Sequence, residues 1–482
     1  MKKIIHPCAD IPENYKSYIE TLEKGDNVII LGEAGTGKST FLNFIRTNQH
    51  PDLNIITLSP TGIAALNVNG QSIHSFFNFD SKILLNKDAF KKYPLEKREI
   101  LESTNLIIID EISMVRADIF KTMDSILKFN LDTREPFGGI QIILMGDVLQ
   151  LPPVVTPDER KFFGRGSEAV YPSEYFFDTD AYKNGNFKPL HFNKIYRQTD
   201  LEFIKILNSI RKGITSSKII DSLNKRIIDN KPNFEKDNPI FLCSTNKNAD
   251  DINEHFLQDI NKKEFIFEGK ITGKFKDEKR LPSPQILKLK VGAKVIFTKN
   301  DPEKKFVNGT IGEVIDIRCR TIYVKLCKEY NFATIEVPLV KWEKKEYVLE
   351  KEAEAEKIDS KKSSLEKIKE IAKKPKPKLE MQVVGTYEQY PLNLAWAITI
   401  HKSQGQTLDS VLIDLDKGCF TEGQVYVALS RCKTFEKLYL LYKLRSRDVK
   451  VNNYVLSFLE TLTERKEDDI ENNGFGDDID FI

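Results

Sequence analysis

The segment Gly32–Ser39, with the sequence Gly-Glu-Ala-Gly-Thr-Gly-Lys-Ser, constrains the fold more than any other part of the chain. It matches the phosphate-binding pattern Gly-x-x-x-x-Gly-Lys-Ser in full. It follows the apolar run Asn27–Leu31, and a helix is expected to start near Lys38. Glycines let the loop wrap phosphates with exposed N–H groups, and the helix N-terminus adds positive potential. We therefore expect a nucleotide-binding α/β module, with ATP and Mg²⁺ as cofactors.

Each residue type of the loop suits one task. Lys38 would reach the β- and γ-phosphates, and the Ser39 hydroxyl would ligate Mg²⁺. The predicted phosphate-binding set is Gly32, Ala34, Gly35, Thr36, Gly37, Lys38, Ser39 and Thr40.

Further apolar strands alternate with helical stretches over about residues 1–190. The expected strands are Ile55–Ser59, Leu106–Asp110 and Ile140–Asp147. Continuous apolar strands separated by helices are typical of a parallel sheet that is covered on both faces.

Acidic and amide side chains stand at the ends of two of these strands. Asp110 would hold Mg²⁺, and Glu111 would polarise the attacking water, because ligands bind where parallel strands end. Gln150, in Met145–Pro153, could sense the γ-phosphate, although a simple Gly-Asp turn explains that segment equally well when it is taken alone.

A second α/β module is expected to follow. One helix is predicted around Phe203–Ile210 and ends at Gly213, and two more are predicted over Asn246–Ile260 and Glu422–Arg431. The predicted strands are Pro239–Ser244, Ala395–Ile400, Val411–Asp414 and Leu438–Tyr442. Short β-strands interrupt it at Val295–Thr298, Gly312–Ile317, Thr321–Leu326 and Thr334–Val337, with a turn at Asn308-Gly309. The Lys/Glu-rich stretch Lys341–Glu380 is compatible with a solvated helix or with a contact to a DNA backbone, except at Lys373–Lys378, where prolines exclude an ordinary helix.

Bulk properties leave the partner open. A formal net charge of +2 neither requires nor excludes nucleic acid, since a local basic groove can hide in a near-zero sum. No apolar run reaches the length of a membrane span and the N-terminus lacks a secretory pattern, so we expect a cytoplasmic, nucleoid-associated protein without a membrane partner.

An ordered set of motifs resembles the petite-integration-frequency (Pif) and RecD-like group of superfamily-one DNA helicases, most closely the Pif group. The matching segments, in the family's order, are Gly32–Ser39, Ser59–Ala65, Ser72–Phe77, Asp110–Met114, Gly146–Pro153, Ile195–Gln198, Trp396–Gly405 and Gln424–Arg431. Glu111–Leu127 also resembles the Pif signature. An ordered set of this kind is far more specific than any single motif.

The resemblance implies two RecA-like parallel-sheet modules in tandem with ATP between them, the second interrupted by a small SH3-like β-barrel. Arg197 and Arg431 would then reach the γ-phosphate, as permanently charged forks suited to phosphate. The first module would span 1–190, with a strand-separating insertion at about 76–100, and the second would span 191–310 and 385–463. The barrel with its Lys/Glu-rich insertion would span 311–384, and an acidic, disordered tail would follow at 464–482.

The family moves 5'-to-3' on single-stranded DNA and unwinds duplex or structured DNA, in replication, repair, recombination or telomere-like maintenance. The resemblance makes single-stranded DNA and DNA junctions the partners, and the chain would act as a monomer. The matching DNA contacts are Pro60, Thr61, Gly62, His74, Phe76, Thr245, Asn246, His401, Lys402 and Ser403, where Phe76 could equally be core. The acidic tail could dock on single-strand-binding or replication proteins.

One departure concerns adenine recognition. The family carries a glutamine about two dozen residues before the P-loop lysine, whereas this chain has Ile11-Pro-Glu-Asn-Tyr15. Asn14 is the candidate replacement, with a shorter side chain. Two other functions remain open at this point: a translocase that moves on DNA without unwinding it, and a nucleotide-switched DNA-binding adaptor.

Overall fold

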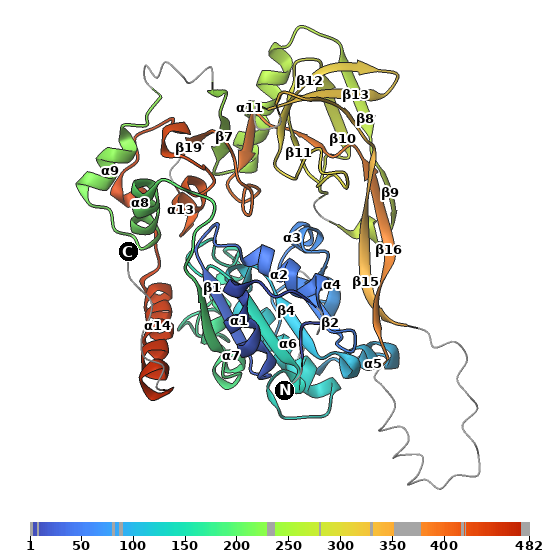
Figure 1. The fold of residues 1–482 in the computed structure, drawn as a ribbon, viewed down its shortest axis with the longest axis vertical. Coiled ribbons are helices and arrows are strands. Elements are labelled where there is room, and N and C mark those ends of the chain that lie inside the picture. Colours follow the sequence, from blue (N-terminus) through green and yellow to red (C-terminus); the bar gives the residue numbers. More distant parts are fainter. Residues whose placement is uncertain are drawn as a thin grey trace, which may run out of the picture.

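The computed structural model describes residues 3–6, 9–79, 82–85, 90–228, 237–278, 281–327, 331–350, 377–415, 419 and 421–473, with side chains described up to residue 463. Two α/β modules lie one above the other in Figure 1, and a β-rich unit with a long ribbon of strands stands beside them. The predicted two-module α/β architecture is confirmed.

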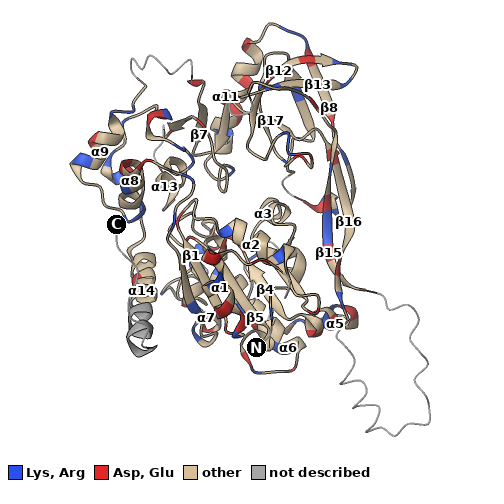
Figure 2. Cartoon of the chain, in the orientation of Figure 1, with Lys and Arg blue, Asp and Glu red and all other residues tan. Residues whose placement is uncertain are grey.

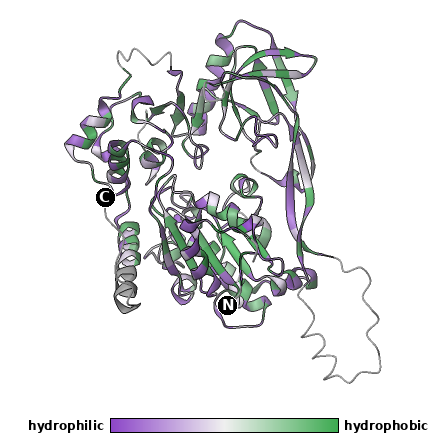
Figure 3. Cartoon of the chain, in the orientation of Figure 1, coloured by the Kyte–Doolittle hydropathy of each residue, from purple (hydrophilic) through white to green (hydrophobic). Residues whose placement is uncertain are grey.

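The first module contains a six-stranded parallel sheet in the order β3-β2-β4-β5-β1-β6. The strands are β1 Val28–Gly32, β2 Ile55–Ser59, β3 Gln71–Ser72, β4 Leu106–Ile109, β5 Gln141–Gly146 and β6 Lys188–Phe192. Those predicted from apolar runs agree within one residue at each end. Alternate residues of β1 face opposite cores: Ile29 and Leu31 belong to one apolar cluster, Val28 and Ile30 to another. Figure 3 shows these strands as apolar.

Helices cover both faces of this sheet: α1 Glu13–Glu23, α2 Lys38–Thr47, α3 Gly62–Asn67, α4 Ile73–Phe77, α5 Leu95–Ser103, α6 Ala117–Asn130 and α7 Asp180–Asn184. The start of α2 at Lys38 is as predicted. Gly37, at the N-cap of α2, has a φ of 87°, a left-handed conformation that glycine adopts without steric cost.

The second module has a four-stranded parallel sheet in the order β18-β7-β19-β20. Its strands are β7 Ile240–Cys243, β18 Ala397–Thr399, β19 Val411–Asp414 and β20 Leu438–Leu440, and its helices are α8 Leu201–Arg211, α9 Ser217–Asn224, α11 Asn246–Asp259 and α13 Gln424–Leu429. Gly213 follows α8 with a φ of 74°, which confirms the helix end expected there.

The inserted unit is antiparallel β-structure. One sheet has the order β14-β13-β12-β11-β17. Its strands are β11 Lys294–Phe297, β12 Ile311–Arg318, β13 Thr321–Leu326, β14 Thr334–Val337 and β17 Leu392–Leu394, and a separate pair consists of β8 Glu264–Glu268 and β10 Ile286–Lys290. The boundary expected between residues 310 and 311 falls inside this sheet, because β11 pairs with β12 and with β17. The short strands were predicted by β-propensity, whereas the pairing of β11 with β17 joins segments far apart in sequence.

A long ribbon formed by β15 Val340–Leu349, β16 Leu379–Gln389 and β9 Lys270–Gly273 links this unit to the first module, and we call it the strap. The possible helix over Lys341–Glu380 is therefore wrong at Lys341–Leu349 and Leu379–Glu380, and residues 351–376 lie outside the described residues. Charged residues are frequent along β15 and β16 (Figure 2) and gave these segments a solvated appearance in the sequence. Two aromatic side chains of β15, Trp342 and Tyr347, are nevertheless buried. A register shift between Lys344 and Lys345 lets both be buried although their numbers differ by an odd count.

The last helix, α14 Asn453–Asn473, lies against the first module. Phe458 stacks on Phe177 with ring centroids 4.0 Å apart, and Val455 and Leu462 are buried in the same core. The expectation of a disordered tail from residue 464 is wrong up to Asn473, because this anchored helix continues through good helix formers such as Glu and Lys. Residues 474–482 lie outside the described residues. Among the helices that the structure describes, none combines the length and apolar character needed to span a bilayer.

Candidate ATP site between the two modules

The P-loop joins β1 to α2 at the carboxyl edge of the first sheet. The Nζ of Lys38 donates to the carbonyl oxygens of Gly32 at 2.7 Å and of Glu33 at 2.9 Å. Burial lowers the pKa of Lys38, although Asp147, Glu111 and Asp110 counteract it. A buried ammonium that donates to two neutral carbonyls is suited to pair with an incoming anion such as phosphate.

Two carboxylates follow β4 beside the loop. Burial raises the pKa of Asp110, and its neighbour Glu111 raises it further; burial also raises the pKa of Glu111. Glu111 has a φ of 54°, which is uncommon for a residue with a side chain. Strained backbone of this kind is concentrated at functional sites. A bound cation would therefore stabilise the charged forms of this pair.

Of the two predicted arginines, Arg197 lies directly against the P-loop. The backbone N–H of Tyr196 donates to Gly35 O at 2.9 Å, and any side chain at Gly35 would collide with the Cβ of Arg197. The guanidinium of Arg197 donates to Gly405 O at 3.2 Å. The structure thus brings the predicted residue to the nucleotide loop.

Arg431 is buried within the second module, at 1% exposure. Its Nε donates to Val427 O at 2.9 Å, and its Nη1 to Ser403 O at 3.3 Å. Burial, followed by repulsion from Arg197, lowers the pKa of Arg431 to about 9. Both arginines therefore lie together opposite Glu111, which favours the charged form of each.

A second-module glutamine that sequence reasoning did not assign reaches the same carboxylate. The Nε2 of Gln404 donates to Glu111 Oε2 at 3.0 Å and to Gln150 Oε1 at 3.3 Å. Gln150 therefore lies at the predicted strand tip and faces the cleft. The position of Gln404 within the motif Trp396–Gly405 was the only signal in the sequence that could have indicated its role.

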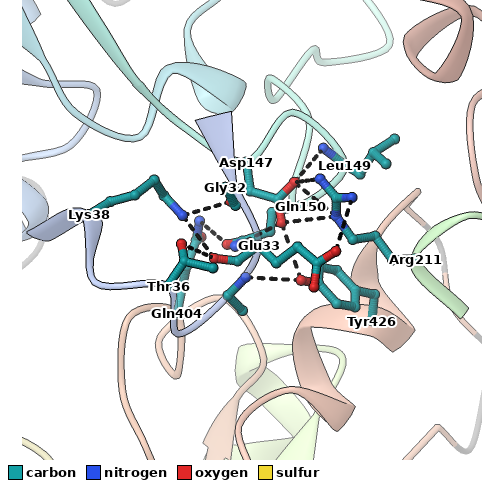
Figure 4. Close-up of polar contacts among 11 residues, drawn as sticks. Gly32, Glu33, Thr36, Lys38, Asp147, Leu149, Gln150, Arg211, Gln404 and Tyr426 are labelled. Atoms are coloured by element: carbon teal, nitrogen blue, oxygen red, sulfur yellow. Dashed lines mark hydrogen bonds and ion pairs between the residues drawn. The ribbon is translucent and has the colours of Figure 1, made fainter. Parts of the chain in front are cut away.

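A buried ionic cluster joins the modules beside this contact (Figure 4). Arg211 of α8 pairs with Asp147, which follows β5, at 2.7 Å between Nη2 and Oδ1. The hydroxyl of Tyr426 on α13 donates to Asp147 Oδ2 at 3.2 Å. Arg211 was not assigned a role from sequence, and Tyr426 was noted only within its motif.

The remaining predicted nucleotide residues lie around the loop. Thr36 is buried and its hydroxyl donates to Glu33 O at 2.9 Å, whereas Ser39 and Thr40 are exposed in the first turn of α2. Asn14 is exposed in the first turn of α1, a helix that packs on α2 through Tyr15 and Phe41. An adenine contact by Asn14 stays a prediction.

The predicted DNA contacts follow the carboxyl ends of parallel strands in both modules. Pro60, Thr61 and Gly62 follow β2, and Thr61 caps α3 by accepting from Ala64 N. Thr245 and Asn246 follow β7, where Thr245 caps α11. His401 and Lys402 follow β18, and His74 is half-buried on α4. Their contacts with DNA stay predictions.

Two residues of that set are corrected. Phe76 is fully buried in the first-module core, with Lys97 Nζ 3.5 Å above its ring, so it is core and cannot stack on a base in this structure. Ser403 is also fully buried, and its hydroxyl donates to Ile400 O at 2.8 Å. For Phe76 the structure thus has the core alternative that the sequence left open, and the Ser403 hydroxyl is used within the second module.

Comparisons with known proteins agree on one family. The family model described as PIF1-like helicase matches residues 13–219. The ATP-dependent DNA helicase Pif1 of Psychrobacter sp. is 32% identical over 88% of this chain and 67% of its own length. The corresponding helicase of Campylobacter jejuni is 29% identical over 86% of this chain and 88% of its own length.

Solved structures give the same result. Bacteroides sp. Pif1 in complex with ADP-AlF4 has a TM-score of 0.80 at 31% identity, covering 95% of this chain and 98% of that one. Bacteroides Pif1 bound to single-stranded DNA has a TM-score of 0.64 at 32% identity over the same shares. At near-equal identity, the arrangement of parts here is thus nearer that of the ADP-AlF4 complex than that of the structure bound to single-stranded DNA, and unliganded Bacteroides sp. Pif1 fits almost equally well, with a TM-score of 0.78. This chain is a member of the Pif1-like helicase family.

Proposed function

We propose that this chain is an ATP-dependent DNA helicase that translocates 5'-to-3' on single-stranded DNA and unwinds duplex or structured DNA. The observation that carries the proposal is the ATP site built from both modules, in which Gln404 and Arg197 of the second module contact Glu111 and the P-loop of the first. A cleft that must close for hydrolysis can convert each ATP into relative movement of the modules. Helicase relatives crystallised with single-stranded DNA support DNA as the track.

The residues also fit the expected cofactors. ATP would bind Gly32–Ser39 with its γ-phosphate between Lys38 and the two arginines. Mg²⁺ would be held by the Ser39 hydroxyl and the Asp110 carboxylate, since magnesium prefers hard oxygen ligands. Burial raises the pKa of Asp110, and a bound cation would offset that effect. The ion would neutralise charge that develops on the phosphates, while Glu111 would orient the attacking water.

The finer assignments rest on the family resemblance. They are a monomeric protein acting at single strands and DNA junctions, a cytoplasmic, nucleoid-associated location, and partners such as single-strand-binding or replication proteins. The segment offered for those protein partners, 464–482, is helical up to Asn473, so docking would involve a helix end and not a wholly disordered tail.

Partial duplexes with either a 5' or a 3' single-stranded tail test the function. The wild-type chain should open the 5'-tailed duplex with ATP and leave the 3'-tailed one closed. Lys38→Ala should remove both hydrolysis and opening, because no other cation would replace the lysine at the β- and γ-phosphates. ATP hydrolysis without strand opening would identify a translocase instead, and DNA binding without repeated turnover would identify a nucleotide switch.

A further inference from the structure

The buried carboxylate of Asp147 accepts hydrogen bonds from several residues of both modules. Arg211 donates to Oδ1 through Nη2 at 2.7 Å and through Nε at 3.2 Å. The hydroxyl of Tyr426 donates to Oδ2 at 3.2 Å, and Leu149 N donates to Oδ1 at 3.2 Å. Asp147 belongs to the first module, whereas Arg211 and Tyr426 come from two different helices of the second, so this carboxylate links the two modules.

Tyr426 continues the connection to the P-loop. Its hydroxyl oxygen accepts from the backbone N–H of Ala34 at 3.0 Å, while its own proton is directed to Asp147. Arg211 also faces the preceding loop residue, with Nη1 3.7 Å from Glu33 Oε1. Glu33 and Ala34, the two P-loop residues after Gly32, are thus contacted by second-module side chains (Figure 4).

Asp147 also orients the predicted phosphate sensor. The side-chain Nε2 of Gln150 lies 3.4 Å from Asp147 Oδ2, and its backbone N–H donates to Asp147 O at 3.0 Å. Gln150 in turn accepts from Gln404 across the cleft. A continuous path of hydrogen bonds therefore runs from α8 and α13, through Asp147, to Gln150 after β5.

The charge states suit this arrangement. Burial acts to raise the pKa of Asp147, but Arg211, Lys38 and the Leu149 N–H together lower it, so the carboxylate stays charged. Burial, and then the nearby carboxylate, raises the pKa of Tyr426, so its hydroxyl keeps the proton that it donates. The tyrosine hydroxyl consequently has one donor and one acceptor, both satisfied.

We propose that Arg211 and Tyr426 are positioning residues that hold the P-loop and Gln150 in the geometry needed for ATP hydrolysis, across the contact between the two modules. Neither side chain needs to touch ATP. They act through Asp147 and the Ala34 N–H, so that turnover depends on second-module side chains that do not bind the nucleotide. This inference rests on the proposed function, because it assumes that the chain hydrolyses ATP in a DNA-dependent manner.

Tyr426→Phe is the sharpest test, since it removes one oxygen atom and leaves the ring. The Ala34 N–H loses its acceptor and Asp147 one donor, and we expect kcat for DNA-stimulated ATP hydrolysis to fall about tenfold. The affinity for a fluorescent ADP analogue should change less than about twofold, because the phosphate-binding groups of Lys38 and the loop remain. Tyr442→Phe, at a half-exposed tyrosine of the same module, is the matched control and should match the wild type.

Arg211→Lys provides a second variant that keeps the charge but loses the forked donor, and it should show the same split between kcat and nucleotide affinity. A folded Tyr426→Phe protein with wild-type kcat would overturn the inference. An equal loss of kcat and of ADP affinity would also overturn it, because that result indicates general damage to the loop. Failure of the wild type to hydrolyse ATP on DNA would instead refute the proposed function, which keeps the two results separate.

Discussion

Gln404→Ala is expected to slow ATP hydrolysis by removing one donor from the water-orienting carboxylate. The Nε2 of Gln404 lies 3.0 Å from Glu111 Oε2 and 3.3 Å from Gln150 Oε1. A hydrogen bond to a charged group contributes about 1.5–3 kcal/mol, and the loss of 1.4 kcal/mol corresponds to a factor of ten. If that contribution is made mainly as the γ-phosphate is attacked, kcat should fall by about 10- to 100-fold.

The assay is steady-state ATP hydrolysis at saturating single-stranded DNA, together with nucleotide affinity in the absence of turnover. Affinity should be almost unchanged, because Gln404 contacts a carboxylate and an amide and not the P-loop. Gln382→Ala, at an exposed glutamine on β16 of the strap, is the matched control. A Gln404→Ala protein with wild-type kcat would refute the reasoning that the second module orients Glu111.

Two further predictions concern the parts that hold the modules in place. Tyr347→Phe removes the hydroxyl that accepts from the buried Thr57 N–H at 2.8 Å, so the free energy of unfolding in urea should drop by about 1–2 kcal/mol, and an unchanged midpoint would show that the strap does not anchor there. Phe458→Ala removes the ring stacked on Phe177 and should cost about 2–4 kcal/mol of stability, with kcat of the folded protein retained. Loss of kcat without loss of stability in that variant would place α14 in the ATP site instead.

Local patterns in the sequence were sufficient to predict the sheets. Continuous apolar runs located β1, β2, β4 and β5 within one residue, because strands buried on both faces need no polar alternation. The P-loop could be placed because Gly37 and Lys38 must stand at a helix start for phosphate binding, and α2 begins there. In these parts the chain's local preference and its tertiary environment agree.

The strap and the end of α14 were predicted less well for a physical reason. Charged residues on the exposed faces of β15 and β16 dominate their composition, whereas two buried aromatics, Trp342 and Tyr347, decide their position. Tyr347 bonds to Thr57, which is 290 positions away in sequence. Such a contact leaves no local periodicity from which it could be inferred.

The candidate site divides in the same way. Lys38, Asp110, Glu111 and Gln150 stand beside recognisable strand ends, so chemistry and spacing predicted their place at one sheet edge. Arg211 reaches that edge from α8 of the second module through its ion pair with Asp147, and its sequence neighbourhood is that of an ordinary amphipathic helix. Phe76 lies in a motif that was expected to contact DNA, but its side chain is part of the first-module core.

The central claim is that one ATP site is completed by side chains from both modules, and turnover by Arg197→Ala tests it most directly. Arg197 comes from the second module's leading segment and packs against Gly35 of the P-loop. ATP affinity should persist, while kcat on single-stranded DNA should fall by about 10³-fold or more, the scale expected for an arginine at the γ-phosphate. An Arg197→Ala protein that hydrolyses ATP at the wild-type rate would contradict the claim.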